Sequence, residues 1–452
     1  MEKTTLMTEG DYRRQILSFA LPLFLGSLFQ QLYSTVDSLI VGNYLGSSAL
    51  AAVTSTGTLS YMVVGFFLGF SSGASVIIAR QIGAQQDEEV HKAVHTAVSL
   101  GLIFGVIMTV VGVCGTDTML KWTATPADVF ADASVYLRTY FMGSMGLIMY
   151  NILVGILQAS GDSRHPLYYL IFSSIVNMIL DILFIAVFHM GIKGAGLATA
   201  AAQFCSMLLV LNRLIRTGES YRVNIRHLLI DMHYVRAIFS YGLPTALQGC
   251  VIDFANLLIQ AYINSFGKAA MAGLGAYSRI EGFMFLPITS FSLALTTYVS
   301  QNLGARKEKR AFQGIRFGTL CTLISIELIG MVIYLFAPQL IHIFIQEEEV
   351  IAYGVLRARI CAPFYFLIGF SHVTSAVMRG LGKPVVPMAV MLICWCGVRV
   401  AAVYLLGETL HSIAFVSWLY PFTWGLSTLV YIAEYVYVLK KEYPGVNMFK
   451  AA

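Results

Sequence analysis

Charged side chains are scarce in this chain. They make up 12% of its 452 residues, about half the share typical of a soluble globular domain. Hydrophobic residues account for 57%, and the mean hydropathy is +0.73. So little charge excludes an ordinary soluble protein and indicates a polytopic membrane protein.

Motifs for covalent chemistry are also missing. The seven cysteines lie within or at the ends of apolar stretches and form no CxxC pair, so neither disulfides nor a zinc site is indicated. The sequence contains no Walker motif and no nucleophile constellation. We therefore expect neither an enzyme nor a protein with a bound cofactor.

Long apolar runs dominate the sequence, separated by short polar stretches. Each run is long enough to cross a bilayer as a helix of about 20 residues. The first is too long for the core of a signal peptide, so it is expected to be a spanning helix. The twelve predicted spans are 15–43, 50–80, 93–116, 133–158, 166–190, 194–216, 237–265, 270–299, 311–337, 352–379, 385–407 and 413–439.

Lysine and arginine set the predicted orientation. With a cytoplasmic N-terminus, most of the 29 basic residues fall in cytoplasmic loops and tails, as the positive-inside rule requires. Both termini are then cytoplasmic, in an inner (plasma) membrane. Because the net charge of +5 is explained by these loops, no nucleic-acid partner is expected.

The chain repeats itself at a nearly constant separation. FALP at 19–22 matches YGLP at 241–244, QIGA at 81–84 matches NLGA at 302–305, and ILQASG at 156–161 matches VMRGLG at 377–382. Six predicted helices separate the copies, so both halves have the same orientation. The predicted organisation is a tail (1–12), a six-helix lobe (13–217), a cytoplasmic linker (218–236), a second six-helix lobe (237–440) and a tail (441–452).

Ionisable residues inside the predicted spans are candidates for function, because burying charge in a bilayer is costly. The acids outnumber the bases, which predicts an acidic interior suited to a cation. The acids are Asp37, Asp181, Asp253, Glu281 and Glu327, and the bases are Arg279 and Arg399. Arg357 is assigned to an outer helix end.

Four polar side chains of the first half share one predicted depth. Counting about 1.5 Å per residue places Asp37, Asn177, Asp181 and Thr199 about a third of the way in from the outer face. Their oxygens suit Na⁺ as a metal ligand set, and a pair of carboxylates could equally hold a proton. The alternative is that these groups only bond one another between packed helices.

In the second half, Asp253 and Glu281 are predicted near the midplane, where they would be cavity acids for a cationic substrate. Arg279 could instead pair with Asp253. Aromatic and methionine side chains would complete an adaptable cavity. The predicted cavity residues are Glu281, Asp253, Tyr33, Tyr61, Met62, Phe66, Tyr150, Met284 and Phe285.

Several motifs together resemble the multidrug and toxic compound extrusion (MATE) family, and most closely its DinF- and MepA-like prokaryotic branch. They are VDSLIVG at 36–42 followed by LG at 45–46, the pair Asn177 and Asp181, GLAT at 196–199, and LQASGD at 157–162. The similarity extends over residues 10 to 440.

The resemblance implies an all-α integral membrane protein of twelve helices in two pseudo-symmetric six-helix bundles. It implies that Asp37, Asn177, Asp181 and Thr199 form a cation-coupling cluster, that the first helix bends at Pro22, and that Glu281 and Asp253 lie at the drug cavity. Relatives commonly have proline after the helix-five aspartate, whereas this chain has Ile182.

The predicted function is secondary efflux of lipophilic, mostly cationic drugs or toxins in exchange for Na⁺ or H⁺, by a monomer surrounded by membrane lipid. The alternative is a lipid or lipid-linked oligosaccharide flippase of the same superfamily. Such a flippase would carry an anionic substrate and need a basic cavity.

Overall fold

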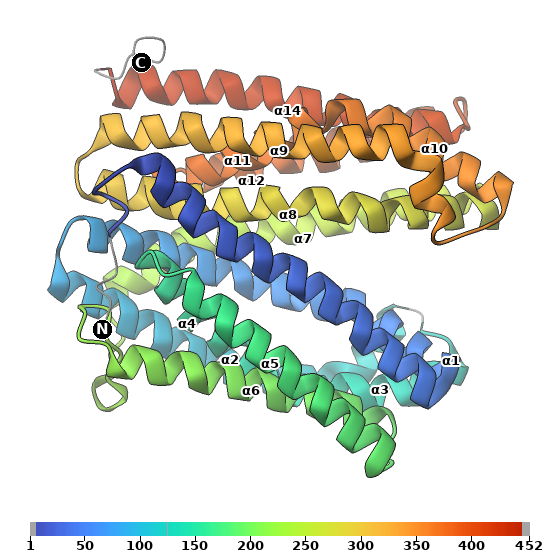
Figure 1. Ribbon diagram of the computed structural model, residues 1–452, viewed down its shortest axis with the longest axis horizontal. Coiled ribbons are helices and arrows are strands. Elements are labelled where there is room, and N and C mark those ends of the chain that lie inside the picture. The colour runs from blue at the N-terminus through green and yellow to red at the C-terminus, as the bar shows by residue number, and fades with distance from the viewer. Residues whose placement is uncertain (1–5, 124, 445–452) are drawn as a thin grey trace. The chain divides into compact units, whose positions relative to one another are not determined.

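The computed structural model describes residues 6–123 and 125–444, and these residues are helical almost throughout, with no β-strand among them. A helix is the natural form for such apolar runs, since each backbone N–H and C=O is then satisfied within its own segment. Figure 1 shows the resulting array of long helices.

The chain forms two compact units. The N-lobe comprises Leu25–Ala246, and the C-lobe comprises Met7–Phe24 together with the chain from Leu247 onward. The first helix therefore begins in the C-lobe and continues in the N-lobe, and the seventh does the reverse. Pro22 and Pro244 lie beside these two exchange points.

The N-lobe helices cover the six predicted spans of this half, although not one for one. They are α1 (Tyr12–Gly83), α2 (Asp87–Trp122), α3 (Ala127–Met142), α4 (Ser144–Ala159), α5 (Arg164–Asp181), the π-helix η1 (Ile182–Val187), α6 (Ile192–Arg216) and the short 3-10 helix η2 (Ile225–His227). α1 contains two candidate spans, Tyr12–Asp37 and Val63–Gly83.

The C-lobe follows the same order. Its helices are α7 (Met232–Asn264, shared with the N-lobe), α8 (Lys268–Gly304), α9 (Glu308–His342), α10 (Glu348–Cys361), the 3-10 helix η3 (Ala362–Phe364), α11 (Tyr365–Leu381), α12 (Val385–Met391), the π-helix η4 (Leu392–Val398), α13 (Arg399–Leu406) and α14 (Ile413–Glu442).

The described residues contain eleven helical stretches long and apolar enough to cross a membrane, or twelve when α3 and α4, which are bent by 46° about their junction, count as one. The prediction of an all-α protein with twelve spanning helices is confirmed.

The internal repeat is visible in backbone detail. α3 and α4 meet at Gly143, and the corresponding span of the C-lobe is interrupted by η3 at Ala362–Phe364. Gly161 and Gly382, which end the two matching helices, have φ of +93° and +94°. Glycine is favoured there because other L-residues are strained at positive φ.

The predicted linker packs against α2 within the N-lobe. The backbone N–H of Asn224 donates to His95 Nε2 at 2.9 Å, and that of Asp231 donates to Thr96 Oγ1 at 3.1 Å. The Tyr234 hydroxyl donates to Glu89 Oε2 at 2.6 Å. These bonds hold the segment against the end of α2 nearest Asp87.

Candidate functional site

Two polar pairs face each other in the N-lobe. α5 carries Asn177 and Asp181, which are 1% and 0% exposed, and α1 carries Tyr33 and Asp37, which are half-buried. Each pair is separated by four residues, so its members lie one helical turn apart on the same face.

The two pairs are in contact. The Tyr33 hydroxyl donates a hydrogen bond to Asn177 Oδ1, and the carboxyl groups of Asp37 and Asp181 are close enough to interact electrostatically. Within the described residues, neither oxygen of Asp181 nor the Asn177 Nδ2 has a hydrogen-bond partner. We call Tyr33, Asp37, Asn177 and Asp181 the N-lobe polar cluster.

The negative charge of this cluster is unfavourable unless a proton or a cation neutralises it. A buried carboxylate without donors loses its hydration and gains no hydrogen bond, which costs several kcal/mol. A second carboxylate nearby adds repulsion. A proton shared by the two aspartates, or a cation held by the carboxylate, amide and phenol oxygens, would relieve both effects.

Thr199 lies on α6 and is half-buried. Its hydroxyl donates to the carbonyl oxygen of Ala195 in its own helix, at 3.1 Å. No hydrogen bond between Thr199 and the cluster occurs in the part of the chain that the structure describes, so its role as a fourth ligand stays a prediction.

Tyr33, which is predicted to line the drug cavity, belongs to the cluster in the structure. Tyr136 and Tyr140 on α3 also lie near enough to Tyr33 to interact with it. Sequence reasoning missed both, although their four-residue spacing puts them on one helical face.

The backbone of the fifth span changes form directly after Asp181. Ile182–Val187 is π-helical, and the N–H of Phe188 donates to the carbonyl of Leu183, five residues back, at 2.9 Å. The fifth span of this chain therefore contains a wider helical turn at Ile182, the position where the resemblance led us to expect a proline. Such π-turns are frequent at functional sites.

The C-lobe interior does not have the predicted acidic character. Arg357, assigned from the sequence to an outer helix end, is buried, as is Arg399. Glu281 interacts electrostatically with both arginines and accepts a hydrogen bond from the Tyr277 hydroxyl at 2.8 Å. The assignment of Arg357 to an outer helix end is wrong because its side chain packs inside the C-lobe, on the ring of Tyr420.

The MatE family model matches residues 22–183 and again 244–405, most of both lobes. The chain belongs to this family. The family predicted from the motifs is therefore confirmed, and the two matched segments coincide with the internal repeat. Members of the family are transporters, and no catalytic family is indicated.

Relatives of this MATE chain extend over nearly its whole length. The probable multidrug resistance protein YoeA of Bacillus subtilis is 26% identical over 95% of this chain and 94% of its own. YpnP of the same organism, also named a probable multidrug resistance protein, is 29% identical over 87% and 88%.

Solved structures agree in fold. A MOP superfamily transporter from Pyrococcus furiosus superimposes with a TM-score of 0.89 at 22% identity, covering 98% of this chain and 99% of that one. The predicted MATE/MOP-type architecture is confirmed, and the chain is an integral membrane protein of this transporter family.

The predicted cavity residues have different environments. Met284 is fully buried in the core of the C-lobe, and its place in a drug cavity stays a prediction. Phe66 packs edge-on against Phe67 with ring centroids 5.5 Å apart, and Tyr150 packs against the N-lobe core. Phe285 meets the His372 ring at 5.9 Å.

Asp253 and Arg279 are both exposed and form no ion pair with each other among the described residues. Asp253 therefore remains available to a cavity. Tyr61 and Met62 lie in α1, but their side chains are outside the described part of the structure.

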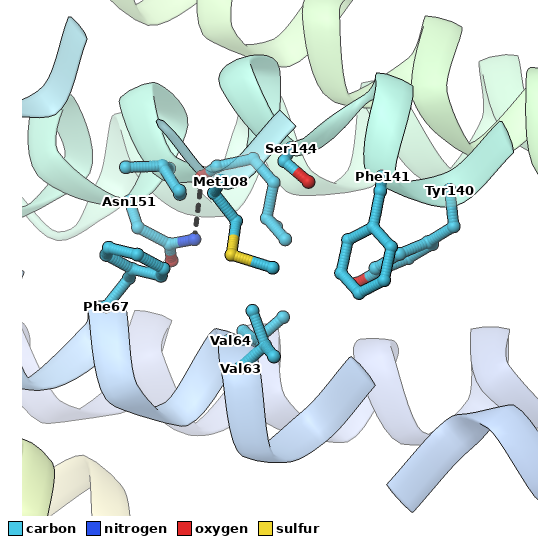
Figure 2. A pocket seen from close by; sticks show the side chains of 10 residues that line it. Val63, Val64, Phe67, Met108, Tyr140, Phe141, Ser144 and Asn151 are labelled. Carbon is cyan, nitrogen blue, oxygen red and sulfur yellow. Dashed lines mark hydrogen bonds between the residues drawn. The ribbon is translucent and has the colours of Figure 1, made fainter. Parts of the chain in front are cut away.

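A small apolar cleft does occur in the N-lobe (Figure 2). Its lining residues are Val63, Val64, Phe67, Met108, Tyr140, Phe141, Ser144, Leu147, Ile148 and Asn151. The Asn151 Nδ2 donates a hydrogen bond to the Leu147 carbonyl at 2.8 Å, so part of the donor capacity of this amide is already used within its own helix. Tyr140 joins this cleft to the polar cluster, since it lies near Tyr33.

Proposed function

We propose that this chain is a multidrug efflux transporter that exports lipophilic, mostly cationic compounds in exchange for Na⁺ or H⁺ by alternating access. Membership of a transporter family and relatives named multidrug resistance proteins support efflux. The observation that carries the coupling is the buried carboxyl group of Asp181, which receives no hydrogen bond from an N–H or O–H donor of the described residues and faces the carboxyl group of Asp37.

In this mechanism the N-lobe polar cluster alternates between two states. A cation or proton entering from outside neutralises the two aspartates, and its release inside leaves them in repulsion again. Tyr33 and Asp37 belong to α1, which passes from one lobe to the other near Pro22. A change in how these two residues pack on α5 therefore acts on the helix that joins the lobes. Coupling follows if ion and drug prefer different states, since a ligand with equal affinity for both shifts nothing.

The test is transport in reconstituted vesicles. A fluorescent lipophilic cation is supplied, and a Na⁺ gradient and a pH gradient are imposed separately. We expect one gradient to accelerate dye movement in protein-containing vesicles and not in protein-free ones. Dye movement that ignores both gradients would overturn the proposal.

One observation favours the flippase alternative: the buried arginines of the C-lobe have the charge that would attract an anionic headgroup. A fluorescent phospholipid in the same vesicles separates the two functions. The exporter predicts dye transport without a change in the distribution of the lipid between leaflets.

A further inference from the structure

Two arginines of the C-lobe are stacked on one tyrosine. Arg357 on α10 is 4% exposed and Arg399 at the start of α13 is 2% exposed. Their guanidinium carbons lie 4.1 Å and 4.2 Å from the ring centroid of Tyr420 on α14. Both guanidinium groups therefore lie against the same aromatic ring.

In the described residues, no ion pair joins Arg357 or Arg399 to a carboxylate. Arg399 donates from Nε and Nη2 to the neutral hydroxyl of Thr423, at 3.3 Å and 2.7 Å. The buried Nε of Arg357 has no hydrogen-bond partner among the described residues.

Among the described residues, Glu281 is the carboxyl group that acts electrostatically on both arginines. Its Oε1 accepts from the Tyr277 hydroxyl at 2.8 Å, and that hydroxyl lies 2.7 Å from the hydroxyl of Tyr365. With Glu281 ionised, the group still contains two positive charges and one negative charge.

An excess positive charge inside a membrane-spanning bundle is unfavourable unless a counter-ion accompanies it. Stacking on Tyr420 compensates only part of the lost hydration, because a cation–π contact is weaker than an ion pair. The missing partner must be negative. One charge suffices, and the burial of both arginines requires the anion to be small.

We propose that the C-lobe binds a small monovalent anion beside the guanidinium groups of Arg357 and Arg399. Guanidinium N–H groups are suited to carboxylates and equally bind a halide such as chloride. The anion is either a free ion or the carboxylate of a transported compound, and the second source rests on the proposed export function. This site is opposite in polarity to the N-lobe polar cluster.

The site is tested on the purified full chain in detergent, with Na⁺ held constant while chloride replaces the bulky anion gluconate. Melting temperature and tryptophan fluorescence are recorded, since the ring of Trp395 lies 5.5 Å from the guanidinium carbon of Arg399. We expect a saturable, chloride-dependent change in both signals. Bromide should substitute for chloride and give an anomalous scattering peak beside the two arginines.

Three variants give predictions of opposite sign. Arg357→Gln and Arg399→Gln should each weaken chloride binding by about tenfold or more. Glu281→Gln removes a negative charge that acts on both arginines and should tighten chloride binding by about fivefold. Arg379→Gln is the matched control, because Arg379 bonds Ser375 Oγ at 2.7 Å, outside the stacked group; its chloride response should equal that of the wild type.

The source of the anion is decided by rhodamine B, which carries a carboxylate, and its ethyl ester, which does not. If chloride competes with rhodamine B but not with the ester, the substrate provides the anion; if it competes with neither, the anion is a free ion. These binding measurements need no gradient, so they are independent of the export test. A wild type with no saturable chloride or bromide response, or an Arg379→Gln variant impaired as much as Arg357→Gln, would overturn the proposal.

Discussion

The hydroxyl of Tyr33 on α1 donates a hydrogen bond to the side-chain oxygen of Asn177 on α5. This bond ties the helix that passes from one lobe to the other to the helix that carries Asp181. It also fixes the orientation of the Asn177 amide, whose oxygen is thereby committed to Tyr33 or shared with a bound cation.

Tyr33→Phe should weaken the binding of the coupling ion without abolishing transport. Loss of the hydroxyl removes one oxygen from the cluster and frees the amide, so the ion concentration for half-maximal dye efflux should rise about three- to tenfold. Maximal efflux at saturating ion should change little. Tyr150→Phe is the control, because Tyr150 packs against the N-lobe core. Equal ion dependence in Tyr33→Phe and wild type would show that the phenol has no part in the site.

Gly382→Ala should destabilise the C-lobe by about 1 kcal/mol, because its φ of +94° is strained for any residue with a Cβ atom. Gly161→Ala should behave alike, since its φ is +93°. Gly282→Ala is the comparison: a Cβ there meets nothing within 4 Å, and alanine is favoured within a helix. Melting temperatures in detergent measure all three, and a Gly382→Ala variant as stable as Gly282→Ala would be inconsistent with this conformation.

The orientation of the chain is predicted from its basic loops and can be measured directly. Glu219 and Glu348 are both exposed and lie at opposite predicted faces. In a variant without the seven native cysteines, Glu348→Cys should react with an impermeant maleimide on intact cells. Glu219→Cys should react only after the membrane is permeabilised. The reverse labelling pattern would show that the topology is opposite to the predicted one.

Much of the fold and part of the site could be predicted from the sequence. The length of a spanning helix and its fixed rise per residue determine depth, so the sequence predicts Asp37 and Asp181 at one depth. In the structure their carboxyl groups interact. Depth alone does not determine which way a side chain points. Asp253 and Glu281 were predicted at the same depth, yet one is exposed and the other lies among arginines.

Arg357 shows that contacts between side chains of different helices are also hidden in the sequence. A positively charged residue near the end of an apolar run is expected to reach toward water, and nothing local in the sequence distinguishes it from one that stacks on an aromatic ring. Its partner Tyr420 belongs to another helix, and only the packed bundle brings them together. The π-helical turn after Asp181 was equally hidden, because Ile182 carries none of the backbone constraint of proline.

The central claim, that the paired aspartates of the N-lobe bind the coupling ion, is tested most directly by Asp181→Asn in reconstituted vesicles. Asparagine preserves the size of the side chain and removes its charge, and Asp253→Asn provides the same change at an exposed acid of the C-lobe. We predict that Asp181→Asn folds normally, as judged by its melting temperature, but that neither a Na⁺ gradient nor a pH gradient accelerates its dye efflux, while Asp253→Asn still responds. Gradient-driven efflux by Asp181→Asn at the wild-type rate would contradict the account.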